Sequence, residues 1–63
     1  MDNKLMKADE VAAVLRISRA MAYKLMSEGQ IPTLRFGKTV RVRESDLVVF
    51  MAKNTRNDEY RGQ

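Results

Sequence analysis

Apolar side chains recur at helical spacing near the start of the chain. They fall at i, i+3, i+4 and i+7, as Ala8, Val11, Ala12 and Leu15. This spacing gathers them on one side of a helix, which is expected to run from residue 7 or 8 to residue 15 or 16. Asp9 and Glu10 lie in its first turn, where the helix dipole favours negative charge, so their expected role is structural rather than catalytic.

Residues 17–29 predict a second, short helix that presents one side to a partner. Ser18 is a suitable N-cap, because its hydroxyl accepts a hydrogen bond from a free backbone N–H, and Gly29 stands where a left-handed residue closes a helix. One side is a narrow apolar stripe of Ala22, Leu25 and Met26. The other side carries cations, an aromatic hydroxyl and small residues, namely Arg19, Ala20, Tyr23, Lys24 and Ser27.

The connection between these two helices is only Arg16 and Ile17. So short a connection forces a sharp turn, which is typical of a helix-turn-helix. No glycine closes the first helix, so Arg16 or a neighbour must adopt the left-handed backbone there. After the second helix, Pro32 prevents its continuation and Ile31 is expected to fill the core.

Residues 33–36 and 40–43 alternate apolar and basic side chains with a period of two, which predicts a short β-hairpin. Gly37-Lys38-Thr39 lies between the two runs as a glycine-containing loop. One face of the hairpin is expected to carry the apolar residues Leu34, Phe36, Val40 and Val42. The other face is expected to carry Arg35, Arg41 and Arg43.

A third helix is expected to begin at Glu44 or Ser45 and to end near Lys53, with Leu47, Phe50 and Met51 on its apolar side. The polar segment 54–63 shows no periodicity and is predicted to be a disordered tail. Leu5, with Met6 as a second candidate, is expected to fold back onto the core. The predicted fold class is mainly α with a small β-hairpin, a winged helix-turn-helix over residues 5–53 in the order helix-helix-strand-strand-helix.

Composition narrows the class of protein further. With 63 residues the chain forms one domain at most, and a domain of that size has a marginal core. The chain contains neither cysteine nor histidine, so disulfides and the common zinc frameworks are excluded and no cofactor or metal is expected. There is no run of apolar residues long enough for a membrane span and no secretory signal, so a cytoplasmic protein without membrane contact is expected. An enzyme is not expected, because no side chain here is suited to activate a nucleophile.

The charge distribution is more informative than the net charge of +4. Between residues 16 and 43 there are seven basic residues and one acid, Glu28, which gives +6 and leaves −2 for the two flanks together. A basic centre that coincides with a capped helix and a hairpin is typical of a phosphate-binding face. The alternative is a solvated charged surface without a partner.

Two roles are considered for the hairpin, contact with DNA and protection of a sheet edge. Because two strands are not stable alone in water, the hairpin must lean on the helices. Its cations then favour a wing that grips a DNA duplex or enters a minor groove, over a hairpin whose arginines protect a sheet edge. The predicted DNA-binding residues are Ser18, Arg19, Ala20, Tyr23 and Lys24 on the second helix and Arg35, Lys38, Thr39 and Arg41 on the wing.

Taken in this order, the chain resembles the excisionase-type DNA-binding domains, small winged helix-turn-helix proteins related to the DNA-binding part of the MerR regulators. The matching stretches are Asp9–Ala12 with Leu15, Ile17–Arg19, Tyr23–Met26, Gly29–Pro32, Arg35–Lys38, Arg41–Val42, and Leu47 with Phe50. The chain departs from the family at Lys7, where a Ser or Thr cap is usual, at Arg16, where glycine is frequent, and at Met21, where a smaller residue is usual.

The resemblance implies that the second helix lies in a major groove and that the loop 37–39 contacts the adjacent minor groove. It implies sequence-specific binding of double-stranded DNA by a recombination directionality factor, which binds beside an attachment site, bends DNA and promotes integrase-mediated excision of a mobile element. Its implied partners are DNA, an integrase or recombinase, and neighbouring copies of itself, in a bacterial or phage setting. The alternatives are a small transcriptional regulator with the same surface and, from another class, a protein-binding adapter without DNA contact.

Overall fold

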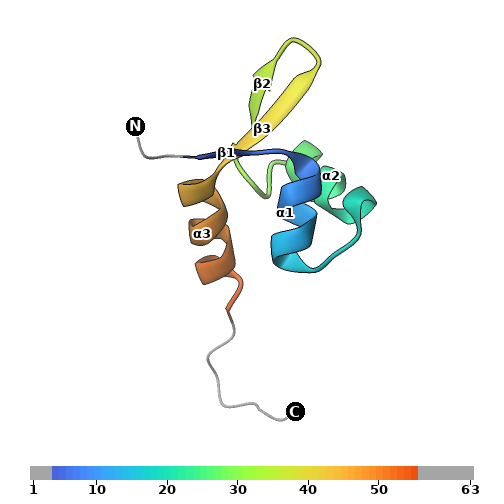
Figure 1. The fold of residues 1–63 in the computed structure, drawn as a ribbon. Coiled ribbons are helices and arrows are strands. Elements are labelled where there is room, and N and C mark those ends of the chain that lie inside the picture. Colours follow the sequence, from blue (N-terminus) through green and yellow to red (C-terminus); the bar gives the residue numbers. More distant parts are fainter. Residues whose placement is uncertain (1–3, 56–63) are drawn as a thin grey trace.

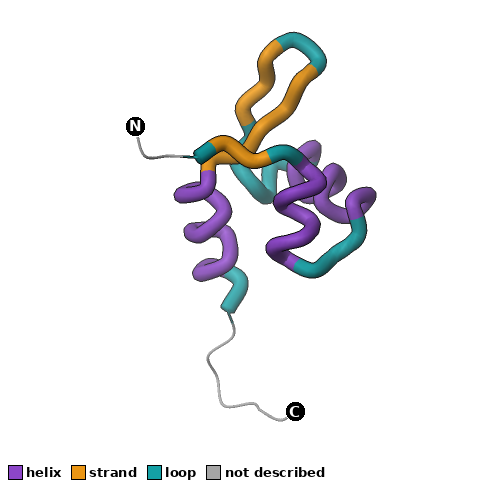
Figure 2. The backbone as a smooth tube through the Cα atoms, viewed as in Figure 1, coloured by secondary structure: helices purple, strands orange, loops and turns teal. Residues whose placement is uncertain are grey.

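The computed structural model describes residues 4–55. Within them, strands and helices follow in the order β1 (Leu5–Met6), α1 (Ala8–Leu15), α2 (Arg19–Ser27), β2 (Leu34–Phe36), β3 (Thr39–Arg43) and α3 (Glu44–Lys53). The β2–β3 hairpin projects away from the helices, as Figures 1 and 2 show. The predicted winged helix-turn-helix and its helix-helix-strand-strand-helix order are confirmed, with the short strand β1 added before α1.

Both ends of α1 are fixed by local hydrogen bonds. At its start the backbone N–H of Lys7 donates to Glu10 Oε1 at 2.8 Å, so Glu10 has the structural role expected of it. At its end Arg16 adopts the left-handed conformation, with φ 58° and ψ 45°. The N–H of Ile17 then donates to the carbonyl of Ala12 at 3.0 Å, which closes the helix. The prediction that Arg16 or a neighbour takes the left-handed backbone is confirmed.

The predicted caps of α2 are also confirmed. Ser18 Oγ accepts a hydrogen bond from the backbone N–H of Met21 at 3.0 Å. Gly29 has a φ of 78°, and the N–H of Gln30 donates to the carbonyl of Leu25 at 2.9 Å, which ends the helix. With both ends fixed, the two helices meet through the short turn at residues 16–18.

All three helices and the base of the sheet contribute side chains to the core. Its fully buried side chains are Val11, Ala22, Ile31, Val42 and Leu47. Strand β3 is the centre of the sheet, in the order β1-β3-β2, and Met6 pairs with Val42. The sequence did not predict β1. Of the two residues expected to fold back onto the core, Met6 is buried, whereas Leu5, the first candidate, is 44% exposed. A strand of two residues is too short to show a period of two.

The predicted faces of the hairpin are wrong. Phe36 pairs with Thr39, so the turn holds only Gly37 and Lys38 instead of three residues. Gly37 has a φ of 66°, as expected for the first central residue of a tight hairpin turn. Shortening the loop by one residue shifts the register of one strand against the other, which turns its side chains to the opposite face relative to the partner strand. Each face of the hairpin therefore carries both apolar and basic residues, instead of one kind only. Leu34 lies opposite Arg41, and Arg35 lies opposite Val40.

Helix α3 follows β3 directly. Leu47 is buried and Phe50 is half-buried against the core, whereas Met51, predicted on the same side, is 37% exposed. Asn54 and Thr55 donate side-chain hydrogen bonds to the carbonyls of Phe50 and Met51, so the first two residues of the predicted tail extend the end of α3. Residues 56–63 of that tail lie outside the described part of the chain. Among residues 4–55 no helix has the length and apolar character needed to cross a membrane.

Candidate nucleic-acid interface

Helix α2 has one buried and one exposed side, as its sequence predicts. Ala22 and Met26 are buried in the core. Arg19, Tyr23 and Lys24 are exposed on the opposite side. The exposed side of α2 is therefore the one that carries the cations and the aromatic hydroxyl.

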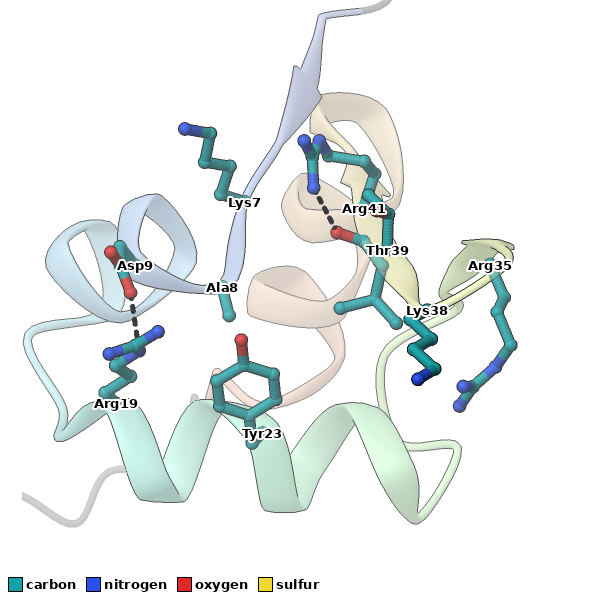
Figure 3. Close-up of a pocket in the computed structure, with 10 residues that line it drawn as sticks. Lys7, Ala8, Asp9, Arg19, Tyr23, Arg35, Lys38, Thr39 and Arg41 are labelled. Atoms are coloured by element: carbon teal, nitrogen blue, oxygen red, sulfur yellow. Dashed lines mark hydrogen bonds and ion pairs between the residues drawn. The ribbon is translucent and has the colours of Figure 1, made fainter.

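An open hollow lies between the exposed side of α2, the start of α1 and the hairpin, and Figure 3 shows its lining side chains. Its volume is about 530 Å³. A second hollow of about 270 Å³ adjoins it and shares Tyr23, Arg35 and Val40 with it. The first hollow, called the basic hollow below, is lined by Lys7, Ala8, Asp9, Arg19, Tyr23, Arg35, Lys38, Thr39, Val40 and Arg41.

Charge in the basic hollow is strongly biased. Five lining residues are cations and one, Asp9, is an acid. The cations come from separate parts of the chain: the residue before α1, the first residue of α2, and the hairpin. A concave surface lined by one sign of charge focuses the electrostatic field and attracts ligands of the opposite sign. The basic hollow is therefore an anion-attracting surface.

The corrected register of the hairpin contributes to this surface. Because Arg35 lies opposite Val40, the two side chains share a face, and both line the two hollows beside α2. Arg41 is half-buried, and its Nη1 donates to the carbonyl of Val40 at 2.8 Å. That hydrogen bond holds the Arg41 guanidinium close to the strand.

Arg19, the first residue of α2, has two neighbours in the hollow. Its Nε lies 2.7 Å from Asp9 Oδ1, and both side chains remain largely exposed, at 66% and 63%. Its guanidinium carbon also lies 5.7 Å from the centre of the Tyr23 ring, within cation–π range. Figure 3 shows Asp9 and Arg19 joined at the α1 side of the hollow, with Tyr23 beside them.

The structure brings together six of the nine residues predicted to bind DNA: Arg19, Tyr23, Arg35, Lys38, Thr39 and Arg41. The other three lie on or next to α2 but do not line the hollow. Ser18 is the N-cap, and Ala20 and Lys24 are exposed on α2. Two of the seven basic residues between residues 16 and 43 have other roles: Arg43 pairs with Asp46 at 3.1 Å, and Arg16 ends α1.

Sequence reasoning missed two charged residues of the hollow, Lys7 and Asp9. Both were interpreted only as part of the start of α1. They reach the hollow because β1 pairs with β3 and so brings the beginning of α1 beside the hairpin. The pairing of a two-residue strand leaves no signal in the sequence. Across the described residues, no group of three or more acidic, histidine or cysteine side chains is arranged to hold a metal ion.

Comparison with known proteins gives a family match over most of the chain. A family model described as "Helix-turn-helix domain" matches residues 5–55. This range contains all the helices and strands described above and every residue that lines the basic hollow. No solved structure gives a significant match to the chain.

Three curated proteins illustrate the relationship. "Uncharacterized protein YvgK" of Bacillus subtilis (strain 168) is 41% identical over 39 residues, which are 62% of this chain and 13% of that protein. The proteins named "Putative DNA-binding protein" MT0521 and Rv0500A, from Mycobacterium tuberculosis strains CDC 1551 / Oshkosh and ATCC 25618 / H37Rv, are each 38% identical over 39 residues. That match covers 62% of this chain and 50% of each mycobacterial protein. The matched part of the chain thus spans half the length of the mycobacterial relatives and a smaller share of YvgK.

Proposed function

The chain belongs to the helix-turn-helix domain family, whose model matches residues 5–55, and on this premise we propose that it binds double-stranded DNA through the basic hollow. The observation that carries the proposal is the convergence of five cations from three parts of the chain around the exposed side of α2. In the proposed complex α2 enters a major groove and the hairpin contacts the adjacent minor groove. Cations placed along both elements neutralise the phosphates between the two grooves. The mechanism involves binding alone, with no catalytic step.

A salt series tests this proposal. Binding of the full chain to a short random-sequence duplex is followed by fluorescence anisotropy at increasing salt concentration. If the five cations of the basic hollow each neutralise one phosphate, the logarithm of the association constant falls with the logarithm of salt at a slope of roughly −4.5. Absence of duplex binding at low salt contradicts the proposal and favours a protein-binding adapter.

A matched control separates the hollow from general positive charge. Lys53 is a cation in the last turn of α3, at the end of that helix far from the hairpin in Figure 1. Lys53→Ala and Lys38→Ala remove the same charge from the chain, but only Lys38 lines the hollow. The proposal requires that Lys38→Ala weakens binding and that Lys53→Ala leaves the salt slope unchanged.

More specifically, we propose that the chain is a recombination directionality factor of the excisionase type, related to the MerR-type DNA-binding domains. The support is the resemblance of the ordered set of motifs, from Asp9–Ala12 through the Arg35–Lys38 turn, to that group. Several copies bound side by side would share the cost of bending a short site, which is of order 1–6 kcal/mol. An integrase is the expected protein partner.

The proposed role as a directionality factor is tested by measuring integrase-dependent excision. In a strain deleted for the gene, loss of integrase-dependent excision, restored by the wild-type chain and not by a Lys38→Ala variant, supports a directionality factor. Normal excision together with altered transcription of neighbouring genes contradicts it and favours a small transcriptional regulator that uses the same surface.

A further inference from the structure

Asp9 is the one acid among the described residues that line the basic hollow. Its side chain is 63% exposed, so it is accessible to a ligand that occupies the hollow. An acid at this place repels phosphate and weakens non-specific binding of DNA. A surface that served only to attract phosphate would gain from its absence. Asp9 lies in the first turn of α1, where the helix dipole favours an acid, and its contact with Arg19 indicates a second role.

The geometry of the Arg19–Asp9 pair indicates that role. The ion pair runs through Arg19 Nε, at 2.7 Å from Asp9 Oδ1. A guanidinium has five N–H donors in a rigid fork, and Nε accounts for only one of them. The four others, on Nη1 and Nη2, are the donors that contact two acceptors side by side. Asp9 therefore fixes the plane of the guanidinium through Nε, while the Tyr23 ring lies beside its central carbon at 5.7 Å.

The position of Arg19 in the fold suits it for reading bases. It is the first residue of α2, directly after the Ser18 cap. In helix-turn-helix complexes, the N-terminal residues of the groove-facing helix contact base edges. The bidentate contact of arginine with O6 and N7 of guanine is the commonest specific contact in a major groove. An arginine already fixed by a carboxylate loses less rotamer freedom when it makes this contact.

We propose that Asp9 is a positioning residue that holds the Arg19 guanidinium for bidentate recognition of a guanine in the major groove. This inference rests on the proposed DNA binding and adds a base preference to it. Asp9 lowers the non-specific affinity for DNA, because it repels phosphates. It raises the selectivity for one base, because it orients Arg19, which contacts that base. The two effects have opposite signs, which makes them separable by experiment.

The test uses the full chain and a library of random-sequence duplexes. Wild-type protein selects binding sites from the library, and base preferences are measured at each position of the selected sites. Asp9→Ala is expected to bind random duplex a few-fold more tightly and to lose about tenfold in preference for one guanine. Arg19→Lys is expected to weaken the same guanine preference, because an ammonium group donates to O6 and N7 without the rigid fork of a guanidinium. Asp9→Asn, which keeps an oxygen acceptor for Nε, is expected to retain part of the preference.

Glu28→Ala is the matched control, because it also removes one exposed acid but lies outside the hollow. It is expected to leave the base preferences of the wild type unchanged. If Asp9→Ala keeps the full guanine preference while its melting temperature falls, the pair only ties α1 to α2 and the inference is overturned. If the wild-type chain retains no duplex from the library, the proposed function itself fails, and the inference fails with it.

Discussion

The register of the hairpin determines how much stability is lost when either of two apolar residues, Phe36 or Val42, is truncated. In the structure Phe36 is 56% exposed and pairs with Thr39, whereas Val42 is fully buried and pairs with Met6. With a three-residue loop instead, Phe36 and Val42 would lie on the same buried face. Truncating each to alanine therefore distinguishes the two registers by their cost in stability.

The magnitudes follow from burial. Phe→Ala in a closed core costs about 3–5 kcal/mol. Phe36 keeps more than half of its surface in water and leaves no closed cavity, so we expect Phe36→Ala to cost about 1 kcal/mol or less. Val42→Ala removes two buried carbons, each worth about 0.8 kcal/mol, and leaves a small cavity, so its expected cost is about 2 kcal/mol.

Thermal unfolding followed by circular dichroism measures both costs. For a domain of this size each 1 kcal/mol shifts the melting temperature by roughly 4–8 °C. We expect the shift for Val42→Ala to be at least twice that for Phe36→Ala. An equal or larger loss for Phe36→Ala would refute the two-residue turn and restore the all-apolar face predicted from the sequence.

Three further predictions concern the helix ends and the hairpin turn. Arg16→Gly should raise the free energy of unfolding by about 1 kcal/mol, since Arg16 has a φ of 58° that glycine adopts without strain, and a lower melting temperature would contradict this. Gly29→Ala should lower it by about 1 kcal/mol purely through its backbone, because an added Cβ meets no atom within 4 Å; an unchanged chemical denaturation midpoint would oppose that reasoning. Lys38→Ala should weaken binding to all duplexes about equally and flatten the salt slope by roughly one unit, and an unchanged affinity would remove the turn from the contact surface.

The helices were predictable because their signals are local. Ser18, Gly29 and the spacing of apolar residues act within one or two turns, so the sequence alone contains what sets the bounds of α1 and α2. The left-handed residue at position 16 was predictable for the same reason, since a turn this short requires one and no glycine is present. In each case the hydrogen bonds that close the helix join residues no more than six positions apart.

The hairpin faces and the strand β1 were not predictable in the same way. Gly37-Lys38-Thr39 accommodates a loop of two or three residues, and the regular alternation of apolar residues favoured the longer one. The shorter turn places Phe36 opposite Thr39 and leaves its ring exposed, while Val42 remains in the core. That choice depends on how β3 packs between β1 and β2, which is a long-range arrangement. The same arrangement brings Lys7 and Asp9 to the hollow.

The pairing of β1 with β3 has a practical consequence for handling the protein. Leu5 pairs with Arg43, and the N–H of Glu44 donates to the carbonyl of Lys4 at 2.9 Å. The beginning of the described chain is thereby bonded to the strand that carries the hairpin. A label fused immediately before residue 4 is attached at the root of the hairpin, whereas one attached beyond residue 55 is linked to the opposite end of α3. Labels for binding measurements therefore belong at the carboxyl end.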